Sequence, residues 1–175
     1  MTLRLRPVRR ADLDTLERWS ADPEAQGRHN WFGFSADGEL RRRFEQDGLL
    51  GSERGNLVVE LEDGNLAGDV SYNAVYHGPN PGSRAFNIGI ALLPAYRGQG
   101  HGSEAQRQLA AYLFAHTRVE RLEASTDVEN VAEQRALERA GFTREGVLRH
   151  AQFRDGSFHD LVLYSRLRGD RPSQG

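Results

Sequence analysis

The stretch IGIALLPAYRGQGHGS, residues Ile88 to Ser103, decides the fold of this chain. A nearly continuous apolar run ends at Pro94, a glycine-rich turn follows, and a periodic helical pattern begins directly after it. Such a turn presents successive backbone N–H groups at a helix N-terminus, where the helix dipole adds partial positive charge. Glycine allows positive φ and a close approach of the ligand. The stretch therefore predicts a phosphate or pyrophosphate site, with Arg97 as a nearby fixed cation.

Upstream of this stretch, strand and helix patterns alternate. The first strand is expected near the N-terminus, two helices follow, and a tight turn at Asp63-Gly64-Asn65 joins two strands of a hairpin. The apolar run before Pro94 suits a central strand that is buried on both faces. The expected strands are 3–7, 56–62, 66–76 and 86–93, and the expected helices are 11–20 and 37–47.

Downstream, a strongly periodic helix runs to His116, and a strand at 120–126, a helix at 130–140 and two strands at 143–153 and 158–167 follow. Helices interrupt the strands in several places, which predicts a mixed sheet. We expect an α/β (α+β) fold with a central sheet of about 6–7 strands and about 4 helices. Residues 1–168 are expected to form one domain, and residues 169–175 a disordered tail.

Composition narrows the function. The chain has 175 residues, 38% of them apolar and 27% charged, with a formal net charge of −2 and no cysteine. Thiolate metal sites, disulfides and a cysteine nucleophile are excluded, and the histidine spacing suggests no metal site. Bulk charge gives no indication of nucleic acid or membrane binding. The N-terminus lacks the apolar stretch of a signal peptide, so a cytoplasmic location is the default expectation.

Three classes of ligand use a glycine-rich turn of this kind. A P-loop requires a lysine followed by Ser or Thr after its last glycine, and Ser103 and Glu104 stand there instead. A dinucleotide motif fits at Gly98 and Gly100, but Ser103 occupies its third glycine position. Ser103 makes the dinucleotide-binding hypothesis less favoured. Because Glu120 lies at about the spacing of the acidic residue in that motif, the hypothesis stays open.

The third class fits best. Arg97-x-x-Gly100-x-Gly102 resembles the Q/R-x-x-G-x-G/A pyrophosphate loop of the GNAT acetyltransferases (Gcn5-related N-acetyltransferases). The segment from Asn130 to Phe142, a helix followed by Gly-Phe, resembles the second signature of that family. The resemblance covers Leu3 to about Leu167 and looks closest to the RimJ/RimL-like branch, which acetylates protein N-termini and small amines.

The resemblance implies an acetyl-CoA-dependent N-acetyltransferase, in which the amine attacks the thioester directly in a ternary complex. Two parallel strands, 86–93 and 120–126, would splay apart to admit the pantetheine arm. The arm would bond to backbone groups of the first strand and to Asn130, and the pyrophosphate to the amides of the loop. The implied cofactor-binding residues are Ile90, Ala91, Leu92, Arg97, Gly98, Gln99, Gly100, His101, Gly102, Ser103 and Asn130.

The catalytic positions depart from the family pattern. Asn87 stands where RimL-like proteins often carry a glutamate, and an amide cannot act as a general base. Glu133 stands where a serine, considered a proton donor to the thiolate, is common. Glu133 either replaces the missing base or closes a capping box with Asn130. Tyr72, Asp69 and His77 are further candidates for a base or a water ligand, each with a structural alternative.

Acceptor binding is expected at the loop Arg28 to Phe34, with His29, Trp31 and Phe32 as candidates, since early helices of the fold wall the acceptor cleft. The aromatic rings of this loop belong either to that cleft or to the core. The acceptor is a protein N-terminus or a small-molecule amine. The family commonly forms homodimers, so a homodimer is expected. A CoA-binding module without catalysis remains an alternative to the enzyme.

Overall fold

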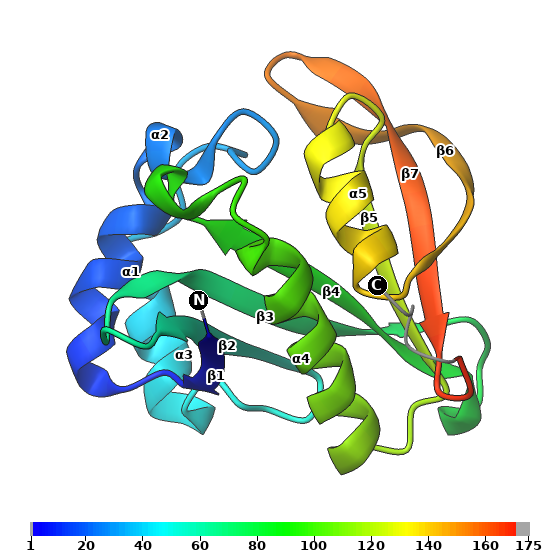
Figure 1. Cartoon of the computed structure of the whole chain (residues 1–175), viewed down its shortest axis with the longest axis horizontal. Helices are drawn as coiled ribbons and strands as arrows, with labels where there is room; N and C mark the ends of the chain where they lie inside the picture. Colours follow the sequence, from blue (N-terminus) through cyan, green and yellow to red (C-terminus); the bar gives the residue numbers. More distant parts are fainter. Residues whose placement is uncertain (1, 171–175) are drawn as a thin grey trace.

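A seven-stranded mixed sheet organises residues 2–170, which are those that the computed structural model describes (Figure 1). The strand order is β1-β2-β3-β4-β5-β7-β6, and every neighbouring pair is antiparallel except β4 and β5. This confirms the predicted mixed sheet. The strands are β1 Leu3–Pro7, β2 Arg54–Leu61, β3 Leu66–Tyr76, β4 Arg84–Leu92, β5 Arg121–Asp127, β6 Thr143–Arg154 and β7 Ser157–Leu167.

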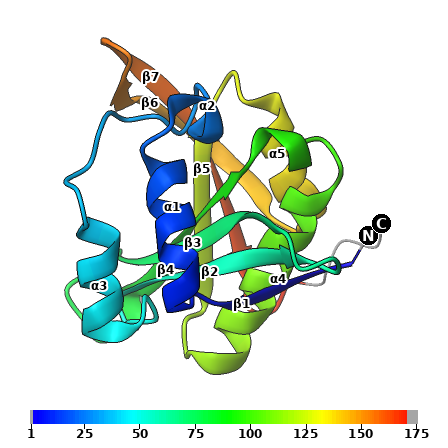
Figure 2. The ribbon, with the colours of Figure 1, turned by 90° about the vertical axis from the view of Figure 1, so that its left-hand side faces the viewer.

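Helices cover both faces of the sheet. Figure 2 shows α4 and α5 on one side, with α1 and α3 on the other. The α-helices are α1 Leu13–Ser20, α2 Pro23–Gln26, α3 Glu39–Asp47, α4 His101–His116 and α5 Val131–Arg139. Short 3-10 turns lie at Arg10–Asp12, Pro81–Ser83 and Pro94–Tyr96.

Strand β2 carries apolar side chains on both faces of the sheet. Its residues Leu57 and Val59 pack beneath α4, whereas Val58 packs against Leu13 and Leu16 of α1. Successive side chains of a strand point to opposite faces, so consecutive apolar residues require an apolar layer on each side. Each such buried side chain contributes about 1.5–3 kcal/mol relative to exposure.

The two parallel strands separate as the sequence resemblance implied. Strands β4 and β5 pair only at Phe86–Leu122 and Asn87–Glu123. Beyond these pairs β4 stays with β3 as far as Leu92, while β5 stays with β7 as far as Asp127. The C-terminal halves of β4 and β5 therefore face an opening instead of each other.

One element was not expected from the sequence. Helix α2 is capped by Asp22, which accepts from the amide of Glu24 at 2.9 Å, and Pro23 occupies its first turn. At the start of the expected disordered tail, the amide of Leu167 donates to Asp170 at 2.8 Å in a turn. Residues 171–175 of that tail lie outside the described residues.

Candidate functional site

The glycine-rich turn at the start of α4 presents backbone amides that are available to a ligand. Gly98 and Gly100 have φ of 72° and 86°, a left-handed conformation that other residues rarely adopt. Within residues 2–170, the amides from Gly98 to Ser103 donate to no protein acceptor, and the next amide, that of Glu104, donates to the Gly100 carbonyl at 3.2 Å. No atom lies within 4 Å of where a Cβ of Gly98 or Gly100 would stand. The loop therefore offers several unpaired donors to open space at the start of a 16-residue helix.

These amides border a cavity of about 420 Å³, here called the loop cavity. It occupies the opening between β4 and β5, and α5 forms its far wall. Nine of the predicted cofactor and catalytic residues line it, together with His29 from the predicted acceptor loop. The nine are Ile90, Leu92, Arg97, Gly98, Gly100, Gly102, Ser103, Asn130 and Glu133.

Arg97 holds the loop to the rest of the fold. Its guanidinium donates to the carbonyl oxygen of Leu92 at 2.7 Å and to that of Ala25, in α2, at 2.5 Å. Burial lowers the pKa of this guanidinium. Arg97 thus forms a structural bridge between β4 and α2, and it lines the loop cavity as a cation that this bridge fixes in place.

Two arginines of α5 add positive charge to the loop cavity beside Arg97. Arg135 and Arg139 line the loop cavity, and the Nε of Arg139 donates to the hydroxyl of Ser103 at 3.1 Å. The two residues are four apart and so share one face of the helix. That spacing, on a helix expected next to the loop, was the signal that the sequence analysis missed.

The edge of β4 presents alternate peptide groups to the opening. The carbonyl of Ile90 accepts from the side-chain amide of Asn30 at 3.2 Å, and that of Leu92 accepts from Arg97. The carbonyl of Ala91 points the other way, since it lies 2.0 Å from where a Cβ of Gly68 on β3 would stand. Of the three predicted backbone contacts, Ile90 and Leu92 therefore face the loop cavity and Ala91 faces β3.

Glu133 lines the loop cavity, and its carboxyl group has a raised pKa. The side chain of Asn130 caps α5 by accepting from the Glu133 amide at 3.3 Å, but the amide of Asn130 donates to the Asp127 carbonyl. The reciprocal half of a capping box is therefore missing, which corrects the structural alternative. Burial raises the pKa of Glu133 to about 7, against a smaller lowering by a hydrogen bond with Gln106. A carboxyl group of this kind exchanges a proton near neutral pH.

A second cavity, of about 340 Å³, lies on the face of the sheet that α1 and α3 cover, and is here called the helix-side cavity. Asp69 of β3 and Ser71 form part of its floor, and Trp19 and Phe32 are among its walls. The two cavities share the wall residues Gln26, Asn30, Ile90 and Leu92. They therefore meet at the splayed end of β4.

The aromatic residues of the predicted acceptor loop do not join the core. Phe32 is 60% exposed and Phe34 is 83% exposed, so burial in the core is wrong for both. Phe32 lines the helix-side cavity. Trp31 lines neither cavity and contacts Phe34 edge to face, with ring centroids 5.2 Å apart.

Other candidates lie away from both cavities. Tyr72 is buried in the core beneath α4, and its hydroxyl donates to the Gly51 carbonyl at 2.9 Å, so it offers no group to the site. Asn87 occupies the last paired position of β4, before the opening begins. The ring of His77 pairs with Glu123 at the opposite end of β5. Gln99 and His101 line neither cavity, and His101 is buried.

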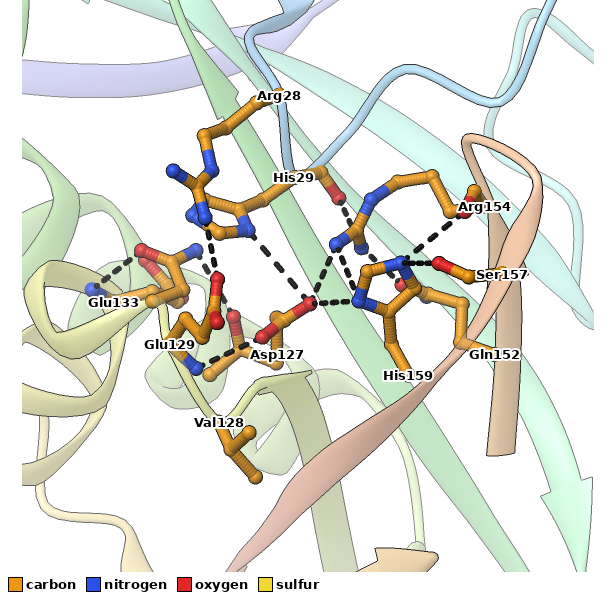
Figure 3. Close-up of polar contacts among 12 residues, drawn as sticks. Arg28, His29, Asp127, Val128, Glu129, Glu133, Gln152, Arg154, Ser157 and His159 are labelled. Carbon is orange, nitrogen blue, oxygen red and sulfur yellow. Dashed lines mark hydrogen bonds and ion pairs between the residues drawn. The ribbon is translucent and has the colours of Figure 1, made fainter. Parts of the chain in front are cut away.

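A buried ion pair fixes the rim of the loop cavity (Figure 3). Arg154 at the end of β6 donates to the Asp127 carboxylate at 2.5 Å, and the two side chains are 4% and 1% exposed. The other arm of Arg154 lies 3.5 Å from the His29 carbonyl, and Arg28 pairs with Glu129 at 2.5 Å. The segment Arg28–His29 is thereby tied across the opening to the turn between β5 and α5.

The same cluster contains Ser157, His159 and Asp127 in a row, but this arrangement does not indicate a catalytic triad. The Nε2 of His159 lies 3.1 Å from the Ser157 hydroxyl and 3.1 Å from the Arg154 carbonyl. A carbonyl only accepts hydrogen bonds, so the Arg154 carbonyl competes with Ser157 for Nε2. Ser157 and His159 also line neither cavity. No three His, Asp or Glu of residues 2–170 gather as a metal site.

The splayed parallel strands and the amide-lined loop define the class of acetyltransferases, and comparisons with known proteins agree. A family model described as "Acetyltransferase (GNAT) domain" matches residues 2–143. The probable N-acetyltransferase YjcK of Bacillus subtilis is 30% identical over 139 residues, 78% of this chain and 75% of the relative. The ribosomal-protein-serine acetyltransferase of Escherichia coli is 26% identical over 140 residues, 79% of this chain and 76% of the relative.

A solved structure shows the same fold. The spermidine N-acetyltransferase from Vibrio cholerae, in complex with CoA and spermine, matches with a TM-score of 0.81 at 22% identity, over 96% of each chain. This chain belongs to the GNAT acetyltransferase family. The resemblance inferred from the loop and the second signature is confirmed, and with it the activity of an N-acetyltransferase. None of the described helices is both long and apolar enough to span a bilayer.

Proposed function

We propose that this protein binds acetyl-CoA in the loop cavity and transfers the acetyl group to a primary amine that enters through the helix-side cavity. The observation that carries this proposal is the shared wall at Ile90 and Leu92. A thioester held along that edge faces the loop cavity on one side and is within reach of a group held in the other. Direct transfer requires this arrangement, because the two reactants must be held together.

The residues around the loop cavity suit a diphosphate and a pantetheine arm. The unpaired amides from Gly98 to Ser103 bind the diphosphate oxygens, and Arg135 and Arg139 supply cations beside them. The side chain of Asn130 and the edge of β4 hold the amide groups of the arm. For this, Asn30 must release the Ile90 carbonyl, which it occupies through an exposed contact.

Acetyl-CoA supplies a thioester, whose sulfur leaves as a thiolate when the acetyl group is transferred. Glu133 lines the cavity between the loop and α5, and its raised pKa leaves a proton on the carboxyl group for a large part of the time at neutral pH. We assign to Glu133 the delivery of that proton to the departing sulfur. This takes the place of the serine that is common at this position.

The test compares two glycines that differ only in location. Gly100 and Gly64, in the β2–β3 turn, both have positive φ and both have free space where a Cβ would stand. Alanine at either position costs about 1–2 kcal/mol of backbone strain, but only Gly100→Ala places a methyl group at the phosphate site. We expect acetyl-CoA to raise the Tm of the wild type and of Gly64→Ala, and to raise that of Gly100→Ala much less.

Turnover is measured as CoA thiol released with a panel of primary amines. The proposal is wrong if acetyl-CoA does not shift the Tm of the wild type. Binding without turnover on any amine would leave only a CoA-binding module. Turnover on at least one amine, lost or strongly reduced in Gly100→Ala, supports the proposal.

We also propose that the protein acts as a homodimer in the cytoplasm. The outer strand β6 and its hairpin partner β7 expose five large apolar side chains, each at least 41% exposed: Val147, Leu148, Phe153, Phe158 and Leu167. An apolar edge of this kind suits contact with a second copy. Light scattering coupled to gel filtration measures the oligomeric state directly.

A further inference from the structure

The helix-side cavity contains a carboxylate with no cation to neutralise it. Asp69 is the one Asp, Glu, Lys, Arg or His among the described residues that line this cavity. It lies on β3 directly opposite Ala91 of β4, one strand away from the edge that faces the loop cavity. A carboxylate in this position, with no cation lining its cavity, suits a cationic partner from outside the chain.

Two cross-strand rows build the floor around Asp69. One row joins Asn56, Ser71 and Gly89, and the next joins Val58, Asp69 and Ala91. A Cβ at Gly89 would lie 2.9 Å from the Ser71 hydroxyl. Glycine at this position therefore leaves the space above the floor open beside Asp69.

A hydrogen-bond chain orients the carboxylate. Arg43 of α3 donates to the side-chain oxygen of Asn56 at 3.2 Å, and the side-chain nitrogen of Asn56 donates to Oδ2 of Asp69 at 3.1 Å. Arg43 is thus one residue removed from Asp69 and does not pair with it. This chain fixes one carboxylate oxygen and leaves Oδ1 for a ligand.

The walls around Asp69 are mostly apolar and aromatic, and their polar side chains, Ser20, Gln26 and Asn30, are uncharged. Leu16 and Trp19 of α1, Leu40 of α3 and Phe32 of the acceptor loop line the cavity above the floor. One carboxylate among such side chains matches a ligand with one cationic nitrogen and an apolar body. A second cationic nitrogen would find no carboxylate in this cavity.

We propose that Asp69 binds the ammonium group of the acceptor and takes its proton, and that the acceptor is a monoamine with an apolar or aromatic body. This rests on the proposed function, because it places the acceptor in the helix-side cavity. The carboxylate of Asp69 accepts one proton from the ammonium group, which becomes a neutral amine. The amine lone pair then forms the C–N bond as the C–S bond breaks. Glu133 gives its proton to the departing sulfur, and the second proton from the nitrogen then reprotonates Glu133. Asp69 releases its proton to solvent.

The protonation behaviour of Asp69 suits this role. Burial raises the pKa of its carboxyl group to about 6, against a smaller lowering by the hydrogen bond from Asn56. The carboxylate is therefore ionised at neutral pH and is a stronger base than an exposed aspartate. Arg43 of α3 contacts Asn56, on the far side of Asn56 from Asp69. The residues that line the cavity from α1, β4 and the acceptor loop include no titratable side chain.

The experiment uses Asp69→Asn with Asp37→Asn as the matched control, because Asp37 is an exposed aspartate outside both cavities. Probes are phenethylamine, the uncharged 2-phenylethanol, and spermidine as a polycation. Binding to CoA-loaded protein is measured by calorimetry, and turnover as thiol release from pH 5.5 to 9. Acetyl-CoA must raise the Tm of all three proteins equally, which shows that Asp69→Asn is folded and retains its CoA site.

We expect Asp69→Asn to bind phenethylamine at least ~10-fold more weakly and to lose about 10²–10⁴-fold in kcat/KM, with 2-phenylethanol unaffected. The increase of wild-type kcat/KM with pH near 6 disappears in the variant. Turnover by Asp69→Asn within threefold of the wild type overturns the role of Asp69. A higher kcat/KM of the wild type for spermidine than for phenethylamine overturns the acceptor class. A wild type that neither binds CoA nor turns over refutes the proposed function itself, which the other two outcomes leave intact.

Discussion

The buried pair between Arg154 and Asp127 gives a sharp prediction for stability. Substitution of Arg154 by alanine leaves the Asp127 carboxylate, 1% exposed, with the Glu129 amide at 2.8 Å and His159 at 3.1 Å as its remaining close partners. Removing one member of a buried ion pair costs about 3–5 kcal/mol, because the other charge stays buried without its ionic partner. Since 1 kcal/mol shifts Tm by about 2–4 °C in a domain of this size, the expected decrease is about 6–20 °C.

The assay is thermal unfolding followed by circular dichroism, with Arg149→Ala as the control. Arg149 lies on the same strand but is exposed, so its substitution should change stability by less than about 0.5 kcal/mol. A double variant, Arg154→Met with Asp127→Leu, removes both charges and should recover a large part of the loss. A decrease for Arg154→Ala no larger than that of Arg149→Ala would refute the reasoning.

The pH dependence gives a second check on the same pair. Burial opposes ionisation of Asp127, but hydrogen bonds from Arg154 and the Glu129 amide outweigh it and hold the pKa below its usual range. A carboxyl group with a depressed folded-state pKa contributes stability above its unfolded value of about 4, and this contribution is lost as pH falls through the folded value. The difference in Tm between wild type and Arg154→Ala should therefore shrink below about pH 4.

Three further predictions follow from burial and capping. Glu133→Gln should flatten the pH dependence of stability, measured by urea titrations at pH 5 and 8. Burial raises the pKa of Glu133 to about 7, so the folded wild type binds more protons than the unfolded chain between about pH 4 and 7. The free energy of unfolding of the wild type should therefore decrease by about 1–3 kcal/mol as pH rises through this range. An equal slope in both proteins contradicts this. Leu109→Ala, at a fully buried position of α4, should cost about 2–5 kcal/mol in the same titration, whereas Leu167→Ala, 41% exposed, should cost far less. Asn130→Ala removes the cap of α5, so it should lower stability by about 1 kcal/mol and weaken CoA binding in calorimetry, and unchanged affinity would separate the cap from the site.

Much of the fold was predictable because its signals are local. The alternation of Leu3 and Leu5 with arginines in β1, the Asp63-Gly64-Asn65 turn and the apolar run before Pro94 each fix backbone conformation within a few residues. The observed elements begin and end close to the expected positions. Helix α2 was missed because four residues carry no periodicity. Only its cap residue Asp22 and Pro23 mark it.

The candidate site was predictable in part. The loop, Asn130 and Glu133 gather around one cavity as expected, since helix starts and strand ends fix them. The role of Arg97 was not predictable, because its partner in α2 is 72 residues away in the sequence. The interpretation of Glu133 as part of a capping box was reasonable from spacing alone. The hydrogen bond from the Asn130 amide to the Asp127 carbonyl decides against it.

The sequence alone determined the local chemistry: a left-handed glycine turn at a helix start, and hence a family of enzymes that bind a diphosphate there. The tertiary structure decided which distant side chains meet at the splayed end of β4. The two cavities combine Asp69 of β3, Asn30 of the loop after α2 and Arg139 of α5. Strand register and helix packing bring these side chains together. Backbone preferences act over a few residues, whereas the partner of a side chain depends on long-range packing that no short segment encodes.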